Sequence, residues 1–313
     1  MSKQQRDALD EMLRAAPLDL GGDVQEQRII FEEMMAAIPL PADVATSPGH
    51  LGGIPVVNLE VAGADPNKVI LYLHGGAYAI GSAASSVGLA SDLARRVGTR
   101  LVCVDYRLAP EHPHPAAIED ACAAYRGLLD SGHAPARIAI AGESAGAGLA
   151  AATLVALKNE ELPQPSSAFL MSPWADLTLS GDSITQKGPL DPALTQAGLR
   201  RRAADYIADR DATDALISPI NADLTGLPPL LIQSGSHEIL LNDATRLATR
   251  AAAADVAVTL QITPGVPHVF QAFAATLDEA DAALTSAGAF LRAHLAAEPH
   301  FLTAPRVLQS SPA

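Results

Sequence analysis

The sequence predicts an α/β fold, a mostly parallel sheet covered by helices on both faces, and three observations predict it. From about residue 54 onward, short apolar segments alternate with longer helical ones. The short segments are apolar almost throughout, as in strands that are buried on both faces of a parallel sheet. The chain has 313 residues, of which 49% are hydrophobic, so it can fill one large core.

Seven segments have the length and composition of strands. They cover residues 54–61, 68–73, 99–105, 137–141, 167–171, 229–234 and 256–262. Helical segments lie between and after them, at residues 85–97, 115–129, 146–158, 240–253 and roughly 268–295. Pro115 opens the second of these helices, where its missing N–H costs nothing. This alternation is typical of parallel strands joined by crossover helices.

Two segments depart from the alternation. Residues 1–45 are helical and then interrupted by prolines, and residues 175–225 hold a polar stretch with an Arg- and Asp-rich helix. We expect the first to be an N-terminal helical cap segment and the second a cap insertion. The remaining divisions are a core of residues 46–174 and 226–298 and a loose tail at 299–313.

The composition disfavours several classes of function. A formal net charge of −14 opposes binding to nucleic acid and to anionic membrane surfaces, because both repel an acidic protein. No apolar run approaches ~20 residues and no signal peptide is visible, so we expect a cytoplasmic protein. Cys103 and Cys122 are too few for a disulfide framework and are expected to be buried, reduced thiols. No G-x-G-x-x-G follows the first buried strand, which disfavours a dinucleotide cofactor.

Residues 142–146 read Gly-Glu-Ser-Ala-Gly and join a predicted strand to a predicted helix. This G-x-S-x-G pattern in that context is typical of a nucleophile elbow, with Ser144 as the nucleophile. The flanking glycines leave room for a strained turn that lifts the serine oxygen above the sheet. The following helix directs free N–H groups toward an oxyanion formed there. The pattern alone also fits a glycine-rich helix start without chemistry, so the other motifs decide.

Two adjacent glycines, Gly75 and Gly76, follow the predicted strand at 68–73. There they allow the backbone to turn with its N–H groups facing the crevice. Acyl transfer needs such donors about 3 Å from the position where a carbonyl oxygen becomes an oxyanion. An ordinary glycine turn is the alternative. The position of the pair, about 70 residues before Ser144, fits the oxyanion loop of hydrolases that use a nucleophile elbow.

A serine is unreactive until a base takes its proton, and His268 is the best placed of nine histidines. It lies in a proline-rich loop after the last strand, the third position in the order Ser, Asp/Glu, His. His237 lies next to Glu238, a carboxylate considered below, on a loop from which we do not expect it to reach Ser144. His112 and His114 alternate with prolines, and with no Cys or carboxylate pair nearby we expect a structured loop there and no metal.

The base in turn needs a carboxylate that fixes its tautomer and balances its developing charge. Glu238 lies on the loop just after the strand at 229–234, and Asp243 lies a turn inside the following helix. We prefer Glu238 because the loop after that strand is where the acid is expected. Asp243 stays open as the alternative, and mutation of each residue would decide between them.

Four motifs in this order resemble the hormone-sensitive-lipase-like α/β-hydrolases, the bacterial family IV esterases. They are residues 74–77 (His-Gly-Gly-Ala), 105–111 (Asp-Tyr-Arg-Leu-Ala-Pro-Glu), 142–146 and 172–174 (Ser-Pro-Trp). The resemblance covers about residues 69–268. It implies an α/β-hydrolase fold with an eight-stranded sheet under a helical cap, and a homodimer as a weaker expectation.

The resemblance also implies roles for individual residues. It assigns the oxyanion hole to the backbone N–H groups of Gly75, Gly76 and Ala145. His74 would brace this loop and Glu143 would support the site. The chain departs from the family pattern twice: Ala77 replaces the usual third glycine, and Glu238 stands where the family usually has Asp.

Together these observations predict a serine carboxylesterase that needs no metal or organic cofactor. With 4% aromatic residues and a cap, we expect small, short-chain esters or lactones as substrates. Tyr78 and Trp174 either wall the substrate pocket or pack in the core. Two alternatives use the same scaffold: an amidase or peptidase with the same triad, and a catalytically silent ligand-binding homologue.

Overall fold

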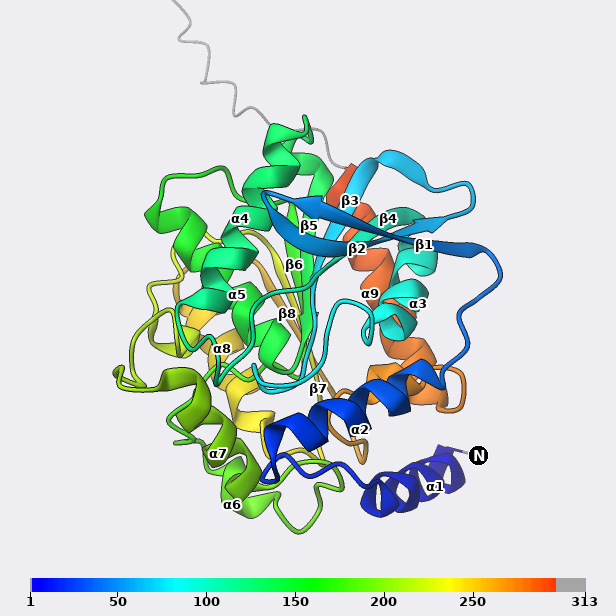
Figure 1. The fold of residues 1–313 in the computed structure, drawn as a ribbon, viewed down its shortest axis with the longest axis vertical. Coiled ribbons are helices and arrows are strands. Elements are labelled where there is room, and N and C mark those ends of the chain that lie inside the picture. The colour runs from blue at the N-terminus through cyan, green and yellow to red at the C-terminus, as the bar shows by residue number, and fades with distance from the viewer. Residues whose placement is uncertain (1, 297–313) are drawn as a thin grey trace, which may run out of the picture.

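The computed structural model of the chain describes residues 2–296 and contains one eight-stranded sheet (Figure 1). Its order is β1-β2-β4-β3-β5-β6-β7-β8. Strand β2 is antiparallel to β1 and to β4, and all other neighbours are parallel. The predicted eight-stranded, mostly parallel sheet is therefore confirmed. The strands are β1 (Val44–Leu51), β2 (Ile54–Val61), β3 (Asp65–Leu73), β4 (Thr99–Val104), β5 (Ile138–Glu143), β6 (Ser167–Met171), β7 (Leu230–Gly235) and β8 (Val258–Thr263).

Helices cover both faces of this sheet. Helices α4, α5 and α8 lie on one face, and α3 and α9 on the other (Figure 1). The described α-helices are α1 (Ser2–Ala15), α2 (Val24–Ala36), α3 (Val87–Val97), α4 (Ala116–Asp130), α5 (Ala145–Asn159), α6 (Ser183–Gln186), α7 (Gln196–Ile207), α8 (Leu241–Ala253) and α9 (Asp278–Ala296). The helix expected at roughly 268–295 is shorter, because its first residues form a loop and the 3₁₀ turn Phe270–Phe273.

Strand β3 shows why the apolar runs are continuous. Leu71 and Leu73 pack into the cluster under α4 and α5, whereas Ile70 and Tyr72 pack into the cluster under α3 and α9. All four side chains are fully buried. Because successive side chains point to opposite faces and both faces are covered, each position along the strand must be apolar.

Strand β1 is the element that the sequence analysis missed. It pairs only with β2, through a two-residue turn at Gly52 and Gly53, both of which have positive φ. Most of its side chains are exposed, and it contains Pro48. An edge strand of this kind carries no apolar pattern to detect, and proline is tolerated there because part of the strand needs no hydrogen-bonding partner.

The two segments predicted to form a cap lie together beyond the ends of the strands. In Figure 1, one end of α2 lies beside α6 and α7, and α1 lies beside the other end of α2. Arg202 of α7 donates from a guanidinium nitrogen to the carbonyl oxygen of Gly22, 3.1 Å away, which ties the insertion to the N-terminal segment. Arg28 of α2 donates to the carbonyl oxygen of Ala79 at 2.8 Å, which ties that segment to the core. The tail predicted at 299–313 lies outside the described residues.

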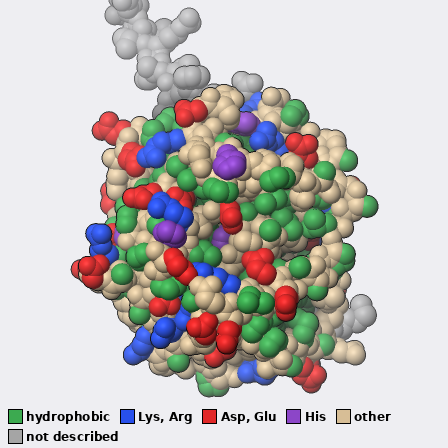
Figure 2. Space-filling model, in the orientation of Figure 1, with side chains coloured by type: hydrophobic (Ala, Val, Ile, Leu, Met, Phe, Trp, Pro, Cys, Tyr) green, Lys and Arg blue, Asp and Glu red, His purple; other side chains and the backbone are tan. Residues whose placement is uncertain are grey.

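The charge distribution, the helices and the cysteines of the structure can be compared with what the composition predicts. Figure 2 shows acidic, basic and hydrophobic side chains interspersed over one face of the molecule. None of the helices in the described part of the chain combines the length and the apolar composition that crossing a bilayer requires. Cys103 and Cys122 are buried free thiols, as predicted.

Candidate active site

Ser144 lies at a strained turn between β5 and α5. Its backbone has φ 54° and ψ −121°, a conformation that non-glycine residues rarely adopt. A Cβ on Gly146 would lie 2.0 Å from the carbonyl oxygen of Leu73, and one on Gly142 would lie 2.5 Å from that of Gly146. Both positions therefore require glycine. The turn has the geometry of the nucleophile elbow that the sequence predicts. Ser144 is largely buried, with 9% of its surface exposed.

The elbow is fixed to the neighbouring strand β6. The N–H of Ser144 donates to the carbonyl oxygen of Met171 at 2.9 Å, and its own carbonyl oxygen accepts the N–H of Trp174 at 3.0 Å. These two bonds hold the N–H and the C=O of the strained serine. The backbone of Ser144 is therefore fixed to the residues at the end of β6.

His268 and Glu238 form a hydrogen-bonded pair at the ends of β8 and β7. His268 Nδ1 lies 2.8 Å from Glu238 Oε2, and both side chains are buried. The loops that follow adjacent parallel strands meet at one edge of the sheet, which brings the two residues together across 30 positions of sequence. Burial raises the pKa of Glu238, while its contacts with His268 and Ser172 oppose that rise.

The other ring nitrogen of His268 is free to act. Within residues 2–296, Nε2 is buried and has no hydrogen-bond partner. The hydrogen bond between this nitrogen and the Ser144 hydroxyl is therefore not formed in the structure. Contacts of this type are often long in hydrolases without substrate and shorten when substrate binds. The arrangement leaves the base with one nitrogen held by a carboxylate and the other available for a proton.

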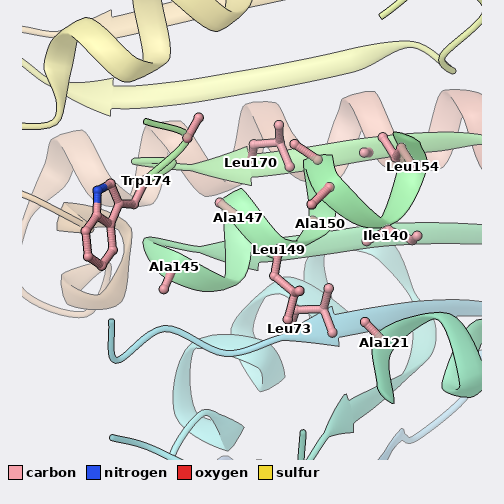
Figure 3. Close-up of a cluster of buried hydrophobic side chains, with 14 of the residues drawn as sticks. Leu73, Ala121, Ile140, Ala145, Ala147, Leu149, Ala150, Leu154, Leu170 and Trp174 are labelled. Atoms are coloured by element: carbon pink, nitrogen blue, oxygen red, sulfur yellow. The ribbon is translucent and has the colours of Figure 1, made fainter. Parts of the chain in front are cut away.

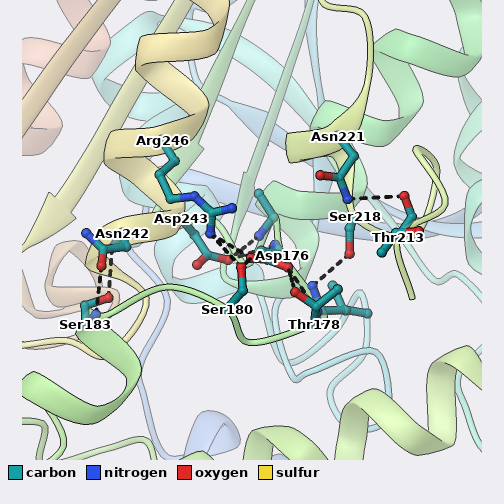
Figure 4. Close-up of polar contacts among 12 residues, drawn as sticks. Asp176, Thr178, Ser180, Ser183, Thr213, Ser218, Asn221, Asn242, Asp243 and Arg246 are labelled. Carbon is teal, nitrogen blue, oxygen red and sulfur yellow. Dashed lines mark hydrogen bonds and ion pairs between the residues drawn. The ribbon is translucent and has the colours of Figure 1, made fainter. Parts of the chain in front are cut away.

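Asp243, the alternative acid, faces a different part of the molecule. Its Oδ2 accepts the N–H groups of Ala175 and Asp176 at 2.9 and 2.8 Å (Figure 4). The neighbouring Arg246 donates to Asp176 at 2.7 Å. Asp243 therefore fixes the chain just after Trp174 and makes no contact with the histidine. Of the two candidates, Glu238 is the carboxylate beside His268.

The burial of Asp243 predicts a pH-dependent stability of the protein. Burial raises the pKa of its carboxyl from 3.8 to about 8, although the two N–H groups oppose this. Between these values the unfolded chain loses the proton and the folded one keeps it, so stability falls as pH rises. We expect up to about 1.4 kcal/mol of lost unfolding free energy per pH unit from this group. Urea unfolding from about pH 5 to about pH 8 measures it, and Asp243→Asn should flatten the slope.

An unchanged slope in Asp243→Asn would show that another group titrates in this range. Glu143 is a second candidate for the titrating group, since burial raises the pKa of its carboxyl to about 7. The same measurement on Glu143→Gln therefore separates the two carboxyls.

The loop after β3 has the backbone conformation of an oxyanion loop. Gly76 has φ 112°, and a Cβ there would lie 2.1 Å from the carbonyl oxygen of Ile80. Ala77 and Tyr78 follow with φ 53° and 60°. Among residues 2–296, the backbone N–H groups of Gly76, Ala77 and Ala145 donate to no acceptor. These three groups are therefore available to a ligand.

The backbone N–H of Gly75, which the sequence analysis expects to be an oxyanion donor, is engaged within the protein. It donates to Glu143 Oε1 at 2.7 Å. The expected donor role of this N–H therefore competes with a side-chain acceptor and stays a prediction. Packing at Gly75 is tight, since a Cβ there would lie 3.2 Å from the carbonyl oxygen of Glu143.

His74 braces the loop, as the family resemblance implies. Its ring stacks on Tyr106 with centroids 4.2 Å apart, and its Nδ1 lies 2.7 Å from the carbonyl oxygen of Gly75. The hydroxyl of Tyr106 donates to the carbonyl oxygen of His74 at 2.7 Å. Burial lowers the pKa of His74 to about 4, so the ring is neutral at pH 7.

Tyr78 and Trp174 are both buried, next to a residue of the insertion. Tyr78 stacks on Tyr206 of α7 with centroids 3.8 Å apart, and Trp174 lies 6.0 Å from Tyr78. In Figure 3, Trp174 lies beside Ala145, beyond the rest of the labelled core residues. Its indole N–H has no partner among residues 2–296. Both side chains are therefore buried at the edge of the elbow, and their expected role in a substrate pocket stays a prediction.

Two serines that the sequence analysis did not single out contact the acid–base pair. The hydroxyl of Ser234, at the end of β7, donates to Glu238 Oε1. The hydroxyl of Ser172, after β6, accepts the N–H of Val269 at 3.1 Å. Ser172 belongs to the Ser-Pro-Trp motif, which was the only signal for it. Both serines hold the loops that carry Glu238 and His268.

A cleft of about 640 Å³ opens between α1 and the loops of the acid–base pair. Its lining includes Arg6 and Asp7 of α1, together with His237 and Pro267, which adjoin Glu238 and His268 in sequence. His237 thus lies at this cleft, and no contact joins it to Ser144. Across residues 2–296, no three His, Cys, Asp or Glu side chains gather in a way that could hold a metal ion.

Comparison with known proteins identifies the family of the chain. A family model described as "alpha/beta hydrolase fold" matches residues 70–272. An acetyl-hydrolase of Streptomyces hygroscopicus is 44% identical over 276 residues, which cover 87% of this chain and 90% of that protein. An esterase of Acinetobacter venetianus is 37% identical over 264 residues, which cover 84% of this chain and 87% of that one.

Solved structures identify the same family. A bacterial esterase described as belonging to the hormone-sensitive lipase family has a TM-score of 0.90 at 41% identity, over 93% of this chain and 98% of that one. The structure of a protein named EstE5, described as soaked by p-nitrophenyl butyrate, has a TM-score of 0.89 at 38% identity. That match covers 94% of this chain and 99% of the other.

Proposed function

Because this chain belongs to the α/β-hydrolase family, among its hormone-sensitive-lipase-like carboxylic ester hydrolases, we propose that it is a serine carboxylesterase acting on small, short-chain esters or lactones. The observation that carries the proposal is the pair of His268 and Glu238, 2.8 Å apart, on the loops after β8 and β7. Ser144 stands at the strained turn after β5 in the same sheet. The three residue types and their chain order match the triad of this fold.

The mechanism follows from the available atoms. Ser144 Oγ attacks the ester carbonyl carbon while His268 Nε2 takes the hydroxyl proton. Glu238 accepts a hydrogen bond from Nδ1–H, which fixes the tautomer and balances the charge of the imidazolium. The imidazolium then gives its proton to the departing alkoxide, leaving an acyl-enzyme. Water, deprotonated by the same nitrogen, hydrolyses that ester and releases the acid.

The oxyanion is held by backbone N–H groups. We assign this role to Gly76 and Ala145, and to Ala77 in place of Gly75, because these N–H groups have no other acceptor in the described chain. Each such donor contributes roughly 3 kcal/mol to transition-state stabilisation. Ala145 begins α5, so the positive end of that helix dipole acts in the same direction.

The substrate size is supported by the aromatic residues near the elbow. Tyr206, from the insertion that we propose as part of the cap, stacks on Tyr78 of the oxyanion loop. These rings and Trp174 are buried beside the elbow, and we propose that they leave room there for a short acyl chain only. One relative is described as an acetyl-hydrolase, and the EstE5 structure as soaked by p-nitrophenyl butyrate, which is consistent with this.

A series of p-nitrophenyl esters from acetate to laurate tests the substrate class. We expect kcat/KM to be highest for acetate or butyrate and to fall with each longer chain, because the aromatic residues limit acyl length. The p-nitroanilide of the preferred acyl group serves as a comparison, and it should be hydrolysed far more slowly. A maximum at a long chain, or faster anilide hydrolysis, would contradict the proposal.

We also propose a cytoplasmic homodimer. Strand β8 is one edge of the sheet and exposes Leu260 and Ile262, each 37% exposed, which suits pairing with a second copy. Both cysteines are free thiols, which suits a reducing compartment. Light scattering of wild type and of Leu260→Lys tests the dimer.

A further inference from the structure

Glu143 connects the elbow to the oxyanion loop, and neither sequence nor comparison assigns it a defined role. It is the last residue of β5 and directly precedes Ser144. Its side chain crosses to the neighbouring loop, where Oε1 accepts the N–H of Gly75 at 2.7 Å. We propose that Glu143 is a positioning residue, which fixes the loop of Gly76 and Ala77 so that their N–H groups face the oxyanion. This inference rests on the proposed function.

The loop needs such an anchor because its backbone is unfavourable. Gly76, Ala77 and Tyr78 have positive φ in succession, and two of them are not glycine. A segment in this state keeps its shape only where the surroundings fix it. Stacking of His74 holds the loop at its start and Tyr78 packs against Tyr206 at its end. Glu143 supplies the fixed point between them.

The contact also sets how close the loop lies to the nucleophile. A Cβ placed on Gly75 would lie 3.3 Å from Ser144 Cβ and 3.2 Å from Glu143 Cγ. The loop therefore rests directly on the elbow, with no intervening side chain. One side chain, on the residue next to the nucleophile, thus fixes the distance between nucleophile and oxyanion donors.

The surroundings of the Glu143 carboxyl argue against a role in packing alone. Its Oε2 and the hydroxyl of Tyr72 from β3 are both buried and form no hydrogen bond of normal geometry, although Tyr72 lies close enough to lower the pKa of the carboxyl against the effect of burial. An unpaired buried oxygen opposes folding, and a methionine of similar length would avoid that cost. The hydrogen bond to Gly75 is the contact that only an oxygen acceptor can make.

Two variants of equal length separate the acceptor from packing. Glu143→Gln keeps an amide oxygen for the N–H of Gly75, and its amide nitrogen can donate to Tyr72. Glu143→Met has no acceptor, and Glu143→Ala removes the side chain. With p-nitrophenyl acetate we expect kcat to be about 100-fold lower in Glu143→Met and Glu143→Ala, with KM within about threefold of wild type. This is the effect of losing one oxyanion donor. Gln should recover most of the lost rate.

Asp120→Ala is the matched control. Asp120 is also a buried carboxylate that accepts a backbone N–H, that of Arg107 at 2.8 Å, but it lies on α4. It should lower the unfolding temperature without lowering kcat. Wild-type turnover, and its loss in Ser144→Ala, tests the proposed function separately.

Two results would overturn the inference while leaving the esterase proposal intact. One is a kcat for folded Glu143→Met within about threefold of wild type, since an oxyanion donor is worth about 100-fold or more. The other is an equal loss in Gln and Met, which would show that the acceptor oxygen is not what matters. If Glu143→Ala fails to fold, the Gln and Met pair still decides.

Discussion

Replacing Ser144 by alanine should lower kcat by about 10,000-fold or more, with the fold unchanged. The hydroxyl oxygen is the atom that forms the acyl-enzyme, and no neighbouring group can replace it at the strained turn. Activity against p-nitrophenyl acetate or butyrate measures the loss. Alanine is compatible with the site, because the serine hydroxyl is not needed for the backbone bonds that hold the elbow.

Ser166→Ala is the matched control for this variant. Its hydroxyl donates to the carbonyl oxygen of Ile138 at 2.9 Å, at the opposite end of β5 and β6 from the elbow. It should keep wild-type kcat and lose a little stability. If Ser144→Ala retained more than about a tenth of wild-type kcat, Ser144 would not be the nucleophile.

Replacing Glu238 by alanine should lower kcat by about 1,000- to 10,000-fold. The change leaves His268 Nδ1 without its carboxylate, so the tautomer is no longer fixed and the imidazolium charge is not balanced. Glu238→Asp should recover part of the rate, because a shorter carboxylate reaches the ring less well. Steady-state kinetics of both variants measures the effect.

Asp243→Ala provides the comparison within the same helix–loop segment. It should lower stability by about 1–3 kcal/mol, because the N–H groups of Ala175 and Asp176 lose their acceptor. Its kcat should fall less than about tenfold. If only Asp243→Ala lost several orders of magnitude in kcat, the assignment of the acid would be wrong.

The parts of the fold that were predictable from sequence are those with a strong burial pattern. Residues 69–73 of β3 and 168–171 of β6 are apolar throughout, because helices cover both faces of the sheet there. Strand β1 has no such pattern, since most of its side chains face solvent and it pairs only with β2. Burial leaves a trace in composition, and exposed edge pairing does not.

The candidate site divides in the same way. Ser144, Glu238 and His268 were predictable because each follows a strand at the sheet edge where loops carry chemistry. The hydrogen bond from Gly75 N–H to Glu143 was not predictable, because it depends on where the Glu143 side chain points. Ser172 and Ser234 were missed for a related reason: contacts between distant loops have no fixed spacing in sequence.

Covalent labelling tests the account's central claim most directly, namely that Ser144 is the nucleophile that His268 and Glu238 activate. Wild-type protein is treated with a p-nitrophenyl alkylphosphonate, and its mass and digested peptides are then analysed by mass spectrometry. The account predicts one phosphonyl group on Ser144, with activity lost in proportion to labelling, and much slower labelling in His268→Ala. An unlabelled Ser144 in fully inhibited protein, or a label on another residue, would contradict it.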